Sequence, residues 1–430
     1  MGYSETIAAP PSAHSALGAS GAERWAACPG SVTLSKGLPR KASRAAAEGT
    51  AAHLLASLEL TGERPLAFPP EYIEADGFVI EVDEDMIEHV RGYCDFVNDE
   101  RAGADTAYHA VEQQLDLARP LGVAPDSPLA GAFGTADAVV VRGSTLKVID
   151  LKYGKGKAVK ADGNLQLSLY ALGALADPVV SLTAGDSITD VELVIYQPRV
   201  YDEPQIEYLT LDELRERGAE LARGAELARA AAEVHEAASE LATIGGPESA
   251  AAAWDTWVAC YLRPGSTQCN WCPVKQAGKC PALEQVVDEA LAIAPAELHG
   301  AELGAAMEKA DLVEQWAEAV RELVRSQLDS GLPVPGWKLV AGRAGARKWA
   351  SDEEAEAALR KLRLPIDTIA PRSVISPTQT EKLVKAGEVS AAQWERLAPL
   401  ITASPTKPVL VPEADKRPAL EVADEFESLA

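Results

Sequence analysis

The sequence predicts a mixed α/β (α+β) fold. Four strand-like runs occupy the middle of the chain, and segments with helical periodicity precede, separate and follow them. With 430 residues, 47% of them hydrophobic, the chain can bury the core of one large or two medium domains. We expect a flexible N-terminus (1–19), a main domain that carries a cysteine cluster (20–300), a C-terminal region with a helix, a hairpin and short helices (301–401), and an extended or disordered tail (402–430).

Helices are expected before the strands. Ser20 is a candidate cap for a short helix that runs through Trp25. A second helix is expected from about Ser43 to Leu60, and an amphipathic helix from about Asp83 to Ala102. The segment between them, 63–82, is Pro-rich and is expected to be irregular.

The remaining elements are expected in the following order. Strands are predicted at Tyr108–Leu117, Gly134–Val141, Thr145–Leu151 and Val191–Gln197, with a helix at Ala161–Ala176 before the last of them. Helices are predicted over 211–243 and about 303–330, followed by a hairpin with a basic turn (Arg343, Arg347 and Lys348) and short helices near 351–362, 377–386 and 390–400.

Charge and hydropathy limit the functional classes. The formal net charge is −25, which argues against a protein that coats nucleic acid, because phosphate contacts need Lys and Arg. A local run of basic residues nevertheless follows the predicted strand Thr145–Leu151. It consists of Lys152, Lys155, Lys157 and Lys160. No run of eighteen apolar residues and no secretory signal is found, so we expect a cytoplasmic protein with no membrane partner.

Three polar residues interrupt or end the apolar strands. Asp137 interrupts the first apolar run, and Asp150 and Lys152 end the second. Alternation along the strand points Asp150 and Lys152 to the same face. Carboxylates bind Mg²⁺, and an ammonium beside them stabilises charge on a phosphate, so a metal-binding hairpin suited to phosphodiester hydrolysis is one interpretation. An edge-strand Asp137 and an ordinary Asp150–Lys152 ion pair are the alternatives.

Other polar residues are weaker candidates by themselves. Glu112, on the preceding strand, would supply a further carboxylate or lie on a solvated face. His53 projects from a helix of small residues, where Gly49 is expected to let another backbone approach closely; it is either a metal ligand or an ordinary helix residue. Gln166 and Tyr170 lie one helical turn apart, so they either contact phosphate or sugar oxygens together or share a half-buried helix face.

The cysteines indicate a metal centre. Three of the six form a C-x2-C-x7-C pattern at Cys269, Cys272 and Cys280. In a reducing compartment such clustering favours metal over disulfides. A four-thiolate site for zinc or an iron–sulfur cluster needs one more ligand. We choose Cys28, which stands in an unusual Cys-Pro-Gly sequence, with Cys260 as the competitor by proximity.

Taken together, these residues resemble the PD-(D/E)XK nuclease superfamily in its RecB-like exonuclease branch. The family's motifs appear in the family's order. They are a helix His (His53), a Glu (Glu112), G-x-x-D (Asp137), D-x-K (Asp150 and Lys152) and Q-x-x-x-Y (Gln166 and Tyr170). Members with an iron–sulfur cluster, of the AddB type, carry one cysteine before the nuclease core and three after it, as Cys28, Cys269, Cys272 and Cys280 do. The segments ERWAACPGS, AEGTAAH, GWKLV and DKRPA further resemble a phage-encoded RecB-like family.

The resemblance implies a restriction-endonuclease-like core, a central mixed sheet flanked by helices. It implies that His53, Asp137, Asp150 and the Leu151 carbonyl hold Mg²⁺ or Mn²⁺, with Glu112 as a further carboxylate. Lys152 would assist the attacking water, and Gln166 and Tyr170, with Lys155 and Lys157, would bind the DNA strand. A [4Fe-4S] cluster on the four cysteines would staple the early helix to the segment after the core. The x7 spacing is longer than is usual, which leaves Zn²⁺ as the alternative.

The expected function is therefore a metal-dependent DNA exonuclease in phage replication or recombination. DNA is the expected partner, together with phage recombination or replication proteins. A catalytically silent DNA-binding or replication-accessory module on the same fold is the second hypothesis. A protein-binding scaffold is the third, and the net charge of −25 fits it best. Polarity, strand preference and oligomeric state do not follow from the sequence.

Overall fold

The computed structural model describes residues 5–9, 15–38, 43–294, 296, 298–340, 360, 377–385, 387, 389–397 and 400. It divides into two compact units, Met1–Val340 and Ala341–Ala430. Within the second unit, the helices α13 (Pro377–Lys385) and α14 (Ala391–Leu397) match the expected short helices. The basic turn with Arg343, Arg347 and Lys348, most of the expected helix near 351–362 and the tail from 402 lie outside the described residues.

The first unit is built on a five-stranded mixed sheet in the order β4-β5-β6-β7-β8. Neighbouring strands are antiparallel except β6 and β7, which are parallel. Helices α5 (Leu165–Ala176) and α6 (Pro178–Thr183) supply the crossover that a parallel pair requires. The mixed α/β prediction is confirmed, while β8 is a strand that the sequence did not predict. The strands are β4 (Thr106–Asp116), β5 (Phe133–Arg142), β6 (Thr145–Leu151), β7 (Asp190–Tyr196) and β8 (Gln205–Thr210).

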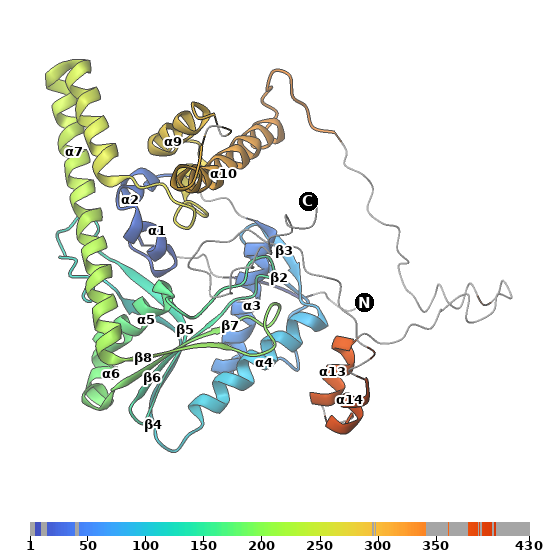
Figure 1. Cartoon of the computed structure of the whole chain (residues 1–430). Helices are drawn as coiled ribbons and strands as arrows, with labels where there is room; N and C mark the ends of the chain where they lie inside the picture. Colours follow the sequence, from blue (N-terminus) through green and yellow to red (C-terminus); the bar gives the residue numbers. More distant parts are fainter. Residues whose placement is uncertain are drawn as a thin grey trace, which may run out of the picture. The chain divides into compact units, whose positions relative to one another are not determined.

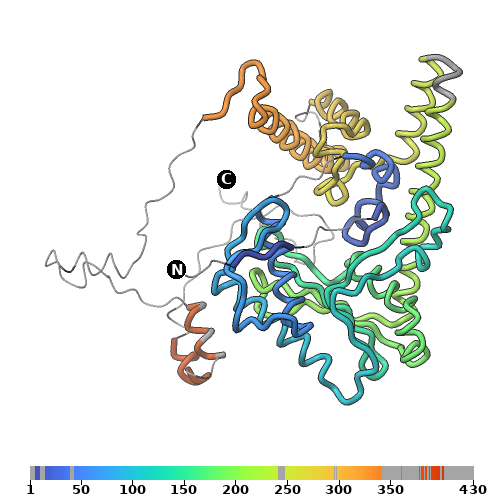
Figure 2. Tube along the Cα trace, turned by 180° about the vertical axis from the view of Figure 1, so that it is seen from behind, coloured from blue at the N-terminus to red at the C-terminus, as the bar shows by residue number. Residues whose placement is uncertain are grey.

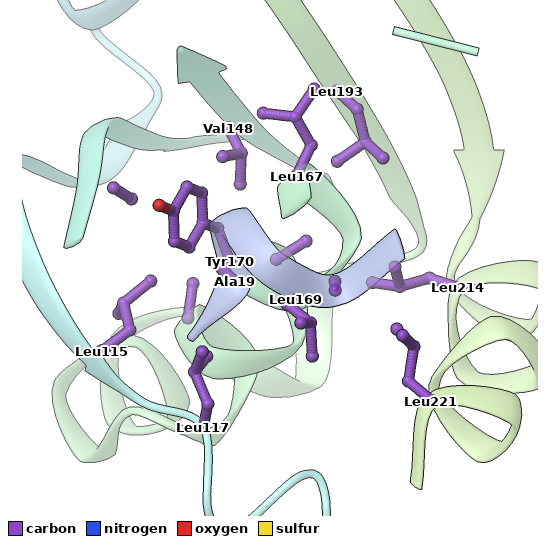
Figure 3. Close-up of a cluster of buried hydrophobic side chains, with 14 of the residues drawn as sticks. Ala19, Leu115, Leu117, Val148, Leu167, Leu169, Tyr170, Leu193, Leu214 and Leu221 are labelled. Carbon is purple, nitrogen blue, oxygen red and sulfur yellow. The ribbon is translucent and has the colours of Figure 1, made fainter. Parts of the chain in front are cut away.

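Helices cover both faces of this sheet (Figure 1). One face packs against α5 and α7 (Leu211–Tyr261), and the other against α3 (Arg44–Thr61) and α4 (Glu84–Arg101). Because β5 is covered on both sides, its run from Ala136 to Val141 is buried at every position, in contrast to the alternation of a half-exposed strand. Figure 3 shows part of the core on the α5 side, with the ring of Tyr170 among Ala19, Leu115 and Leu117.

The boundaries of α3 and α4 follow capping residues that the sequence offers, whereas the predicted cap Ser20 lies within η1 (Ala19–Gly21) and the N-cap of α1 (Ala22–Ala27) is Gly21, without a side-chain hydrogen bond. The Ser43 side chain accepts from the Ala46 backbone N–H (3.1 Å) at the start of α3, and Gly62 ends this helix with φ +74°. The Asp83 side chain accepts from Met86 (2.8 Å) at the start of α4. The helices predicted over about 43–60 and 83–102 are confirmed.

A second, three-stranded sheet differs from the sequence expectation. It consists of β1 (Thr6–Ala8), β2 (Tyr72–Ala75) and β3 (Phe78–Glu81), in segments expected to be a flexible lead-in and an irregular linker. Asp76 and Gly77 have φ +49° and +79°, the left-handed conformations of a tight hairpin turn that Asp-Gly favours. This Asp-Gly signal was present in the sequence, whereas β1 depends on pairing with β2, 66 residues later, and on packing of Ile7 against the core.

The helix α7 is longer than expected and folds back on itself. The indole N–H of Trp257 donates to the Ala231 carbonyl (2.8 Å), 26 residues earlier. In a straight helix these residues would be roughly 39 Å apart. Figure 2 shows the two arms side by side, with the early helices against their base. The helices in this region are η1 (Ala19–Gly21), α1 (Ala22–Ala27), α2 (Gly30–Ser35), α8 (Pro273–Gln276), α9 (Pro281–Leu291) and α10 (Ala301–Asp329).

Candidate active site

The register of the central sheet aligns three acidic residues across neighbouring strands. β5 pairs with β6 through Ala138 and Ile149, so the next residues, Asp137 and Asp150, face each other at the end of this pair. β4 pairs with β5 on both sides of Asp137, which puts Glu112 opposite it. The strands thereby bring together the three carboxylates that the sequence singles out.

The Asp137 carboxylate is buried and contacted from two sides. Its Oδ2 accepts from the backbone N–H of Leu151 (2.7 Å), and its Oδ1 lies 3.2 Å from Nδ1 of His53. Burial by itself would raise the pKa of Asp137, but His53 and then Lys152 outweigh it and lower that pKa. Burial would likewise lower the pKa of His53, whereas Asp137 and Asp150 raise it to about 9. His53 must therefore release a proton before it can bind a metal.

Glu112 reaches the group from an unusual backbone conformation. Its φ is +49°, in the left-handed region that non-glycine residues rarely adopt. The Glu112 side chain is exposed to the cleft, yet desolvation by the surrounding protein, and then the negative charge of Asp137, raise its pKa to about 7. The left-handed backbone and the raised pKa of Glu112 each cost folding free energy. Residues with such unfavourable features are found most often at functional sites. Glu112 consequently gains or loses its proton near neutral pH unless a bound cation offsets the negative charge of Asp137.

His53, Glu112 and Asp137 form a candidate metal site. Each offers one ligand atom, and the three atoms lie within 4.8 Å of one another. An imidazole nitrogen and two carboxylate oxygens at this spacing suit a divalent cation. The sequence-based ligand set differs from this triad, because it includes Asp150 and the Leu151 carbonyl and treats Glu112 as a further carboxylate.

Asp150 and Lys152 belong to a connected network beside the triad. Lys152 Nζ lies 2.8 Å from Asp150 Oδ2 and donates to Gln166 Oε1 (3.1 Å). Gln166 Nε2 in turn contacts Asp150 Oδ1 (3.2 Å) and the Tyr170 hydroxyl (3.1 Å). Asp150 is 2% exposed, and burial raises its pKa although Lys152 opposes this. The D-x-K and Q-x-x-x-Y residues thus lie in one network.

Two glycines shape the surroundings of the network in different ways. A Cβ at Gly134 would lie 2.7 Å from Cε1 of Tyr170, so the aromatic ring packs directly on the strand backbone. Gly49 was expected to let another backbone approach α3 closely, and this expectation is wrong. A Cβ at Gly49 would meet no described atom within 4 Å. Gly49 instead lines an open cleft.

This cleft of ≈ 1060 Å³ extends over the triad and the Lys152 network. It exceeds the roughly 300–1,000 Å³ typical of small-molecule pockets. Its walls come from α3, the strand ends, α5, the segment around η1 and α1, and the cysteine-bearing loop before and within α8. Arg24 and Lys152 are the Arg and Lys side chains among the described residues that line it.

The loop after β6 lies outside this cleft. Lys155 and Lys157 are exposed and do not line it. A buried amide that the sequence reasoning missed anchors this loop: Gln197 donates to the Gly154 and Lys157 carbonyls (2.7 and 2.9 Å) and accepts from Val159 N–H (2.8 Å). Gln197 ends an apolar strand with a polar side chain, which is the pattern that singled out Asp150.

Four of the six cysteines line a second, small cavity. Cys28 comes from the junction of α1 and α2, and Cys269, Cys272 and Cys280 come from the segment after α7. Cys260 is exposed and does not line the cavity. The structure thus brings Cys28, rather than Cys260, together with the C-x2-C-x7-C cysteines.

The sulfur atoms of this cavity are contacted by backbone amides. The N–H groups of Arg263 and Gly265 point at Cys28 Sγ (3.3 Å) and Cys269 Sγ (3.4 Å). Burial nevertheless raises the pKa of Cys28 and Cys269, and raises that of Cys280 to about 12. A metal bound here would have to offset the cost of forming the thiolates.

Comparison with known families gives one match. The sequence matches, over residues 14–418, a family described as a protein of unknown function (DUF2800). The chain belongs to this family. Among the helices that the structure describes, none combines the length and the apolar character needed to span a lipid bilayer.

Proposed function

We propose that this DUF2800 protein is a metal-dependent DNA nuclease of the PD-(D/E)XK superfamily, in the RecB-like exonuclease branch. The observation that carries the proposal is the junction of the His53–Glu112–Asp137 triad with the Asp150–Lys152 pair in one cleft. A mixed sheet with a single parallel pair and helices on both faces is the architecture that this assignment requires.

The donor set fits Mg²⁺ or Mn²⁺, and the imidazole favours Mn²⁺ of the two. A divalent cation held by the triad supplies Lewis-acid chemistry to the scissile phosphate. The protein's own contribution is charge and position. The Lys152 ammonium, oriented by Asp150 and Gln166, stabilises negative charge on the phosphate and orients the attacking water. Asp150 adjoins the metal position and is a further ligand in this proposal.

For the cysteines we propose an iron–sulfur cluster, in the family's [4Fe-4S] form. Cys28, Cys269, Cys272 and Cys280 line one cavity, and each iron of a cubane cluster takes one thiolate. Zn²⁺, which also binds four thiolates, is the alternative.

The nuclease proposal is tested with full-length protein purified without oxygen. Linear single-stranded and double-stranded DNA, labelled at one end, is incubated with Mn²⁺, Mg²⁺ or chelator. We expect end degradation with Mn²⁺ and Mg²⁺ only. Asp150→Asn should lower kcat by at least about 100-fold, since it weakens the charge-stabilising pair. Asp126→Asn, an exposed acid outside the cleft, is the matched control.

The other outcomes decide against the proposal. If metal-replete wild-type protein binds DNA tightly but leaves it intact, the silent DNA-binding module replaces the nuclease. If it neither binds nor cleaves DNA at low salt, the net charge of −25 favours a protein-binding scaffold.

A further inference from the structure

The cysteine-bearing loop contributes an exposed tryptophan to the cleft that contains the metal triad. Trp271 lines this cleft and is 75% exposed, whereas Trp25 and Trp257 are buried at 0% and 1%. An indole is among the largest apolar side chains, and leaving it in water forgoes a large burial gain. An aromatic side chain exposed inside a functional cleft therefore indicates a binding partner for its face.

The turn that carries Trp271 is held in place on both sides. Cys269 and Cys272 flank it and are each 5% exposed. The Cys272 N–H donates to the Cys269 carbonyl (3.3 Å), and buried Lys275 donates through Nζ to the Asn270 carbonyl (3.2 Å). The neighbours of the indole are thus anchored while the ring itself projects into the open. This arrangement presents an exposed aromatic face on an anchored turn.

Polar groups line the cleft together with the indole. Thr267, Gln268 and Gln276 line the cleft with it, and Arg24 lines both the cleft and the cysteine cavity. An aromatic face with hydrogen-bonding and cationic groups alongside is the composition of single-strand nucleic acid sites. The acidic chain, at −25, also gains little from long-range attraction to phosphates, so uncharged stacking is an effective source of affinity.

We propose that Trp271 is a stacking platform for a nucleobase of a single DNA strand whose phosphate lies at the metal triad. The proposal rests on the nuclease function proposed above and adds how that site holds its substrate. Bases inside a duplex have both faces covered by their stacked neighbours, whereas bases of a single strand can be unstacked and inserted against the indole, so the platform favours single-stranded ends. The cysteine centre, formed by Cys28, Cys269, Cys272 and Cys280, then has a second role, because Cys269 and Cys272 fix the position of the indole between them in the cleft.

The protein side of the test uses steady-state kinetics on a short, end-labelled single-stranded oligonucleotide with Mn²⁺. Trp271→Ala should raise KM about 5- to 150-fold, the range for loss of one stacked base, with kcat within about twofold of wild type. Trp271→Phe should retain most of the affinity. Trp337→Ala is the matched control, because Trp337 is 69% exposed and does not line the cleft. Iron and zinc are measured in every variant.

The DNA side of the test removes bases rather than the indole. Oligonucleotides with one abasic site at successive distances from the cleaved end are compared by KM. Wild type should lose affinity at one position, and Trp271→Ala should show no further loss there.

Three results would overturn the stacking platform. Equal KM values for wild type, Trp271→Ala and Trp337→Ala would contradict the stacking role of Trp271 and would leave the nuclease proposal unaffected. A fall in kcat accompanied by metal loss assigns Trp271 a purely structural role. Wild-type protein that neither binds nor cleaves DNA removes the proposed function and the platform together.

Discussion

At the scale of single residues, the close placement of Asp137 and Glu112 costs free energy when no cation is bound. His53, Lys152 and the Leu151 N–H lower the pKa of Asp137, and desolvation followed by the charge of Asp137 raises the pKa of Glu112 to about 7. Glu112 also has a left-handed φ of +49°. The chain retains a like-charge neighbour and a strained backbone at the same position, as expected where a bound metal offsets both.

Replacing Glu112 should reveal this cost as a pH dependence of stability. The pKa of Glu112 is raised from 4.5 to about 7, so its contribution favours folding fully below pH 4.5 and is lost as the pH rises to about 7. In metal-free buffer, Glu112→Gln should therefore be more stable than wild type at pH 8, with a smaller difference at pH 5. Thermal unfolding at the two pH values measures this.

Added metal provides the control for that experiment. Mn²⁺ should raise the Tm of wild type at pH 8 and raise that of Glu112→Gln much less, because the variant lacks one ligand. Equal shifts in both proteins would exclude Glu112 from the metal site.

At the scale of elements, the cysteine centre joins segments far apart in sequence. Cys28 follows α1, and its three partners come at least 241 residues later, around α8 and α9. The approach is close: a Cβ at Gly30 would lie 2.9 Å from the side chains of Leu262 and Trp257. The helix after Cys28 therefore packs directly on the end of α7, and the proposed metal cluster would link the elements that border the cleft.

Replacing Cys28, but not Cys260, should weaken the link between the early helices and the segment after α7. Cys28→Ser should lose most of its bound metal and unfold at least about 5 °C below wild type, because structural metal binding is coupled to folding. Cys260→Ser should match wild type, since Cys260 is exposed and outside the cavity. Metal analysis with visible absorbance and thermal unfolding measure both effects. Metal loss in Cys260→Ser instead would reverse the assignment.

The loop after β6 should depend on one buried amide. Gln197→Leu removes the contacts to Gly154, Lys157 and Val159, and should cost about 1–3 kcal/mol of unfolding free energy. Hydrogen exchange of peptides covering 154–160 should accelerate. Gln205→Leu, which removes a surface bond to the Glu203 carbonyl, is the control. Unchanged exchange in Gln197→Leu would contradict the anchoring role.

At the scale of the whole molecule, charge works against DNA binding. The chain carries −25, and Arg24 and Lys152 are the Arg and Lys side chains among the described residues that line the cleft. Affinity should then depend on local contacts and stacking more than on long-range attraction.

The salt dependence of DNA affinity tests this balance. About two phosphate contacts predict a slope of log K against log salt near roughly −1.4 for single strands. The slope should not change in Lys155→Ala/Lys157→Ala, because neither residue lines the cleft. Fluorescence anisotropy over a range of salt concentrations measures it. A slope about twice as steep that drops in the double variant would show that the loop binds DNA as the sequence predicts.

The sequence by itself determined the features that depend on local periodicity. Alternation put Asp150 and Lys152 on one face, helical spacing put Gln166 beside Tyr170, and capping residues marked the ends of α3. These follow from geometry within a few residues.

Only the tertiary structure decided how distant segments meet. It places Glu112 within ligand distance of His53 and Asp137, and it decides between Cys28 and Cys260 by bringing Cys28 to the three cysteines beyond α7. It also pairs β1 with β2 and puts Trp271 in the same cleft as the triad. Such contacts depend on strand register and helix packing across the whole unit, and local patterns along the chain carry no record of them.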